Sequence, residues 1–140
     1  MPVLARVALV VALLTLAACG SQKPADAVRS SVDRFGKAVA DRDYQELCDN
    51  LLAGNLIVAL EDHGVPCELA LKAGLGQARA PKLDIRTISV NGDKALAAVH
   101  STAANQPPSD DTLSLHREHG KWKISALARP EPQPPAAKQP

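Results

Sequence analysis

Leu83-Asp84-Ile85-Arg86-Thr87-Ile88-Ser89-Val90-Asn91-Gly92 is the stretch in which the chain changes from helix to strand. After Pro81, apolar residues recur at every second position, which is the period of a half-buried strand. Leu83 and Ile85 share one phase, whereas Ile88 and Val90 share the other. A phase change of one residue predicts a β-bulge at Arg86-Thr87. The dipeptide Asn91-Gly92 then predicts a tight hairpin turn.

Further strands are predicted after this hairpin. Ala95, Ala97, Val99 and Ser101 would form one face of the next strand, and Leu96, Ala98 and His100 would form the other. We predict a polar loop over residues 104–111, followed by strands over 113–117 and 122–126 that turn at His119-Gly120. From Arg129 onward, five prolines in twelve residues predict a disordered tail over 129–140.

Helices are predicted before the strands. Val28, Val32, Phe35 and Val39 are spaced by four, three and four residues, which predicts an amphipathic helix over 26–41. On its outer face Asp33 and Lys37 would form an ion pair, and a close backbone approach would explain Gly36. Further helices are predicted over 44–52, capped by Asp43, over 55–62, and from Pro66 through Leu69, Leu71 and Ala73 to a stop at Gly74 and Gly76.

Helices followed by an antiparallel meander indicate the α+β class. We expect the N-terminal helices to pack on one face of a curved antiparallel sheet of about four strands.

Two motifs add a resemblance to this fold class. They are Ala-Asp-Arg-Asp-Tyr-Gln-Glu-Leu-Cys over 40–48 and Leu-x-x-x-x-Gly-Lys-Trp-Lys-Ile over 115–124. With this order of elements, residues 26–128 resemble the nuclear-transport-factor-2-like cone fold, in the branch found as small bacterial lipoproteins. Members of that fold often carry a short strand or hairpin between the second and third helices, where residues 55–64 are helical in our prediction.

The first nineteen residues predict export. Arg6 precedes an apolar run of ten residues, too short to span a bilayer, so residues 1–18 are predicted to be a signal peptide. Leu16-Ala17-Ala18-Cys19 resembles the lipobox of bacterial lipoproteins, which implies cleavage before Cys19 and lipid on its sulfur. Residues 19–25 would then be a lipidated tether. The domain would be anchored to the cell membrane or outer membrane and face outside the cytoplasm.

Cys48 and Cys67 are the cysteines that remain after Cys19 is lipidated. In an oxidising compartment this pair predicts a structural disulfide. A metal or redox pair is the alternative, but the spacing is far from Cys-x-x-Cys.

The charge of the mature chain limits its partners. Arg6 is the only charge before Cys19, so the mature chain carries as many basic as acidic residues. A net charge of zero argues against nucleic-acid binding and against holding anionic lipids by charge alone.

Enzymes of the resembled fold, such as ketosteroid isomerase and scytalone dehydratase, place a carboxylate or histidine in an apolar pocket. Strand phase predicts that His100 and His116 lie on the outer face, and it leaves Ser101 and Arg117, with Thr87 near the bulge, as polar residues inside. None of these three is a general base, so no catalytic residue, metal site or cofactor is predicted. Tyr44 and Glu46 would be the remaining candidates if the second helix lines the mouth of the pocket. The predicted pocket lining comprises Phe35, Val99, Ser101, Leu113, Leu115, Arg117, Trp122 and Ile124.

These observations favour a non-catalytic binding module for a small apolar ligand or an envelope protein. An isomerase or dehydratase of the same fold and a cell-envelope spacer are the alternatives. The half-apolar outer sheet face, with Leu96 and Ala98, would serve for a homodimer.

Overall fold

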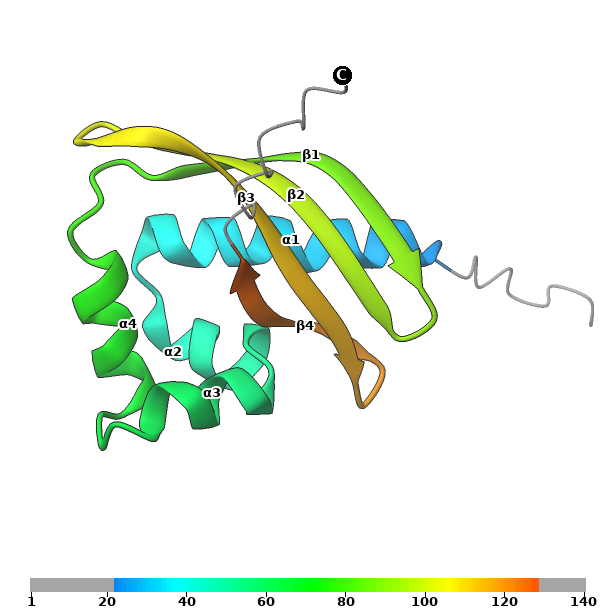
Figure 1. The fold of residues 1–140 in the computed structure, drawn as a ribbon, viewed down its shortest axis with the longest axis horizontal. Helices are drawn as coiled ribbons and strands as arrows, with labels where there is room; N and C mark the ends of the chain where they lie inside the picture. The colour runs from blue at the N-terminus through cyan, green and yellow to red at the C-terminus, as the bar shows by residue number, and fades with distance from the viewer. Residues whose placement is uncertain (1–21, 129–140) are drawn as a thin grey trace, which may run out of the picture.

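The computed structural model describes residues 22–128, so the predicted signal peptide, Cys19 and the tail over 129–140 lie outside the described residues. The element order is helices first and strands second, as the sequence predicts. Helix α1 lies along one face of the sheet, and the shorter helices gather at one end of the molecule (Figure 1).

Helix α1 (Pro24–Asp41) follows the predicted amphipathic pattern, with proline in its first turn. Val28, Val32 and Phe35 are buried. Lys37 pairs with Asp41 and not with Asp33, so the predicted partner is wrong, although the spacing of four residues holds. No helix within residues 22–128 has the length and hydropathy needed to cross a bilayer.

The second predicted helix is a composite. Its first turn, α2 (Tyr44–Glu46), is capped by the Asp43 carboxylate, which accepts the Glu46 N–H at 3.0 Å, as predicted. It then widens into the π-helical turn η1 (Leu47–Leu51), in which the Leu52 N–H donates to the Leu47 carbonyl at 2.9 Å. Nothing in the apolar pattern separates a π turn from an α turn, so the sequence predicted a plain helix.

Helices α3 (Gly54–Glu61) and α4 (Cys67–Leu75) complete the helical part, and both were predicted. Cys48 in η1 and Cys67 at the start of α4 form a disulfide with their Cα atoms 6.2 Å apart, which confirms the predicted pairing.

The sheet has four antiparallel strands in sequence order: β1 (Lys82–Asn91), β2 (Lys94–Ala103), β3 (Gln106–Glu118) and β4 (Lys121–Ala128). The register between β1 and β2 shifts between Ile85 and Thr87, which confirms the predicted bulge at Arg86. Gly92 has a φ of +59° in the predicted hairpin turn.

The predicted polar loop over 104–111 is wrong. Strand β3 begins at Gln106, and only Ala104 and Asn105 turn the chain. Pro107 and Pro108 are compatible with a strand at this position. Strand β4 pairs only with residues 112–118 of β3, so the two prolines lie at a free edge of the sheet. They also lie next to a shift in the register between β2 and β3.

The free edge of β4 is joined to the segment before α3. Leu52 forms a parallel bridge with Ile124, and the Ala53 N–H donates to the Ile124 carbonyl at 2.8 Å. This single bridge stands where members of the resembled fold often have a short strand, and the following segment is helical, as predicted.

Candidate functional site

Most of the predicted pocket residues lie in the packed core. Phe35, Val99, Leu113, Leu115, Trp122 and Ile124 are only 1–5% exposed and belong to one cluster with the buried residues of α1 and η1. A side chain with almost no surface open to a water-sized sphere does not line an open cavity. These six side chains therefore fill the space between the sheet and the helices.

The two polar candidates lie at the margin of this core. Ser101 is half-buried near the end of β2. Arg117 pairs across the sheet with Trp122, and its guanidinium carbon lies 5.6 Å from the centre of the indole ring. The Arg117 Nε–H also donates to Asp93 at 2.9 Å, and the side chain is 45% exposed. Arg117 thus shares the inner face with Trp122, as strand phase predicts, but it lies at the exposed end of that face and does not line a pocket.

The histidines of the sheet lie on its outer face, as strand phase predicts. His100 and His116 pair in register with Asp84 and Lys94, opposite in phase to the buried Val99 and Leu115. His100 Nδ1 lies 2.7 Å from Asp110, and His116 Nε2 lies 2.7 Å from Glu118. Within residues 22–128, no three His, Cys, Asp or Glu side chains come together as metal ligands.

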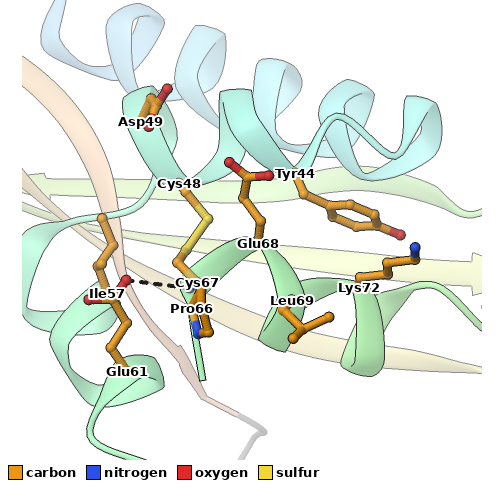
Figure 2. A pocket seen from close by; sticks show the side chains of 10 residues that line it. All are labelled: Tyr44, Cys48, Asp49, Ile57, Glu61, Pro66, Cys67, Glu68, Leu69 and Lys72. Atoms are coloured by element: carbon orange, nitrogen blue, oxygen red, sulfur yellow. Dashed lines mark hydrogen bonds between the residues drawn. A yellow bond between two sulfur atoms is a disulfide. The ribbon is translucent and has the colours of Figure 1, made fainter. Parts of the chain in front are cut away.

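A hollow in the described part of the chain lies among the helices. It has a volume of about 790 Å³ and is open to solvent along one side. Figure 2 shows the disulfide bridging η1 and α4 in its wall, with the ends of Tyr44 and Lys72 turned toward one another. Its lining consists of Tyr44, Cys48, Asp49, Ile57, Glu61, Pro66, Cys67, Glu68, Leu69 and Lys72.

A second hollow of about 380 Å³ continues the first along α4. The two share Tyr44, Leu69 and Lys72, and the second adds Arg42, Ala73, Gly76 and Gln77. Positions 69, 72, 73 and 76 are spaced as i, i+3, i+4 and i+7, so they form one face of α4. We call the two hollows together the α4 groove.

Local geometry holds the groove walls in place. Pro66 precedes the first turn of α4, and the Cys67 N–H donates to the Glu61 side chain of α3 at 3.4 Å. At the other end, a Cβ on Gly76 would overlap the Lys72 carbonyl oxygen and stand 3.3 Å from the Tyr44 hydroxyl, so a side chain at this position would clash with the end of α4 and crowd Tyr44. The disulfide joins the third wall, η1, to α4.

The groove is lined by both apolar and charged side chains. Leu69 is 57% exposed, and the exposed Pro66 and Ala73 line the same groove. The first hollow carries the carboxylates of Asp49, Glu61 and Glu68, Lys72 lines both hollows, and Arg42 lines the second. An extended ligand with apolar side chains and a basic group at one end would match this arrangement.

None of the eight predicted pocket residues lines the α4 groove. Leu69 and Leu71 both belong to the predicted helix that starts at Pro66, but only Leu71 is buried. Residues two apart on a helix point in directions about 200° apart, so one of them had to be exposed. That pattern was the available signal for the groove.

Comparison with known proteins identifies the fold alone. A de novo designed protein with the NTF2 fold superposes with a TM-score of 0.53 at 15% identity, covering 79% of this chain and 91% of its own. The solution structure of a SEC-C motif containing protein from Rhodopseudomonas palustris gives a TM-score of 0.51 at 10% identity, covering 76% and 91%. No family model and no curated protein matches the sequence. The chain therefore has an α+β, nuclear-transport-factor-2-like fold.

Proposed function

We propose that this chain is a lipid-anchored module of the bacterial cell envelope that binds an extended segment of a partner protein in the α4 groove. The lipobox residues before Cys19 support the anchor, and the α4 groove supports the binding role. The proposed activity is non-catalytic.

The single observation that carries the binding role is that exposed apolar residues, Leu69, Pro66 and Ala73, line a groove that charged side chains also line. A pocket for a small ligand normally buries most of the ligand surface. This groove is open along one side, so it suits an extended chain that runs along α4 better than an enclosed small molecule. The filled core between sheet and helices supports the same choice.

A site-specific photo-cross-linker tests this proposal in cells. Placed at Leu69 in the groove, it should capture a defined partner protein. Placed at Leu96, an equally exposed leucine on the far face of the sheet, it should not. The captured species should disappear when Tyr44→Ala or Glu68→Lys is added to the Leu69 probe.

Equal capture at both positions would contradict a groove-specific partner. A bound small molecule retained in native mass spectrometry, and lost in Leu69→Glu but not in Leu96→Glu, would replace the protein partner with a small ligand. Both leucines are more than half exposed, so neither change should unfold the domain.

A further inference from the structure

The outer face of the sheet is divided by charge along the strand direction. At one end, the cross-strand row Asp84, His100 and Asp110 carries two carboxylates, with the exposed Lys82 beyond it at the start of β1. At the other end, the row Lys94, His116 and Lys123 carries two ammonium groups. The rows between them hold neutral side chains, apart from Arg86 at the bulge of the edge strand β1.

The cations at this end are available to an outside partner. Lys94 and Lys121 are exposed, and neither forms an ion pair with another residue of the described chain. The nearby anions are engaged. Asp93 pairs with Arg117, and Glu118 accepts hydrogen bonds from His116 and from the Gly54 N–H. Glu46 accepts a hydrogen bond from Asn50 and pairs with Arg34, and these contacts, together with the charge of Lys121, lower the pKa of its carboxyl. The end therefore presents free positive charge.

The proposed lipid anchor would be attached close to this cationic end of the sheet. Helix α1 starts at Pro24, only five residues after Cys19. Five residues reach about 17 Å at most, so an acyl chain on Cys19 would hold the start of α1 close to the headgroups. Figure 1 shows the start of α1 and the β1–β2 turn at one end of the long axis of the molecule, with α4 at the other. Lys23, just before α1, is exposed and adds a further cation.

We infer that this cationic end, formed by Lys23, Lys94, Lys121 and Lys123, lies against anionic phospholipid headgroups and orients the domain with the α4 groove directed away from the membrane. The inference rests on the proposed lipid anchor. A lysine near an anionic leaflet strengthens binding about fivefold, so a few lysines orient a domain that the acyl chains already hold. The neutral net charge of the mature chain is compatible with this role, because the charges are separated along the sheet.

Energy transfer in vesicles tests the orientation. The purified lipoprotein would carry one dye-labelled cysteine, at Asn91→Cys near the cationic end or at Ser109→Cys near the acidic end. Cys48 and Cys67 are bonded and Cys19 would be acylated, so the new thiol is the one that labels. Both native side chains are exposed. The acceptor dye sits on lipid headgroups in vesicles of neutral phosphatidylcholine, with or without a third of anionic phosphatidylglycerol.

We expect stronger transfer from position 91 than from position 109 in anionic vesicles. The difference should shrink at least twofold in neutral vesicles, in 1 M salt, and in the Lys94→Glu/Lys121→Glu variant. The matched control Arg79→Glu/Lys82→Glu carries the same charge change at the other end of β1 and should keep the difference.

Equal transfer from the two positions in anionic vesicles would overturn the inference, and so would a difference that neutral lipid preserves. Neither outcome would contradict the proposed lipid anchor, because in both cases the protein is bound to the vesicles. A chain that carries no fatty acid and does not enter vesicles overturns the proposed anchor itself, and this orientation with it.

Discussion

Gly36 of α1 lies directly against Leu83 of β1, such that a Cβ added to Gly36 would stand 3.3 Å from the Leu83 Cβ. This is the close approach that explains a glycine inside the helix. Without a side chain at Gly36, α1 can approach the sheet closely where β1 begins, and this contact determines the distance between helix and sheet there.

Substitution of Gly36 should therefore have an effect that depends on side-chain size. Gly36→Ala should change the free energy of unfolding by less than about 1 kcal/mol, because the gain in helix propensity offsets the tight contact with Leu83. Gly36→Leu should destabilise by about 1–3 kcal/mol, since α1 must move away from β1. Denaturant unfolding followed by circular dichroism measures both, and equal stability of the two variants would contradict the close packing.

The Cys48–Cys67 disulfide should contribute strongly to stability. Closing a loop between residues 19 apart in sequence stabilises by about 3 kcal/mol in the chain-entropy model. The Cys48→Ala/Cys67→Ala variant should lose about that much free energy of unfolding in denaturant titration. The wild-type protein in reductant is the control and should show a similar loss. Unchanged stability in both would show that the bond constrains nothing in the unfolded chain.

Glu118 should make stability depend on pH at acidic values. Desolvation raises the pKa of its carboxyl, but the hydrogen bonds from His116 and the Gly54 N–H outweigh it and lower the pKa below the ordinary value of 4.5. A carboxyl with a lowered pKa in the folded state stabilises the fold above the unfolded pKa and loses this contribution as pH falls through the folded pKa.

The difference in unfolding free energy between wild type and Glu118→Gln should therefore be largest near pH 7 and should vanish below the folded pKa. A carboxyl titration by NMR should give a midpoint below 4.5 for this residue. A midpoint above that value would contradict the hydrogen-bonded arrangement of Glu118.

Replacement of Cys19 should abolish the proposed anchoring. Cys19→Ser should leave a precursor that is uncleaved or mis-sorted and incorporates no fatty-acid analogue, because the Cys19 thiol is the proposed acceptor of the lipid. Detergent partitioning and metabolic labelling measure this, with Cys48→Ala/Cys67→Ala as a control that keeps labelling. A Cys19→Ser protein that still takes up the label would exclude lipidation at this residue.

The sequence by itself was sufficient for the fold class and for the order of helices and strands. The spacing of Val28, Val32 and Phe35 predicted α1, the phase change around Arg86 predicted the bulge, and the two cysteines left for pairing form the disulfide. The helix and the bulge depend on residues that are close together in the sequence, so hydrophobic periodicity is enough to predict them. The disulfide depends on the number of available cysteines, because two cysteines can pair in only one way.

Tertiary structure decided the rest. Pro107 and Pro108 favour a loop over residues 106–111 in the sequence. In the structure this segment belongs to β3: β2 pairs with it on one side, and its other edge is free. The π turn at Leu47–Leu51 and the exposure of Leu69 likewise depend on how η1, α3 and α4 pack together. The α4 groove is formed by three segments that come together only in the packed fold. Local sequence patterns do not predict contacts between residues that are distant in the sequence, so the groove could not be predicted.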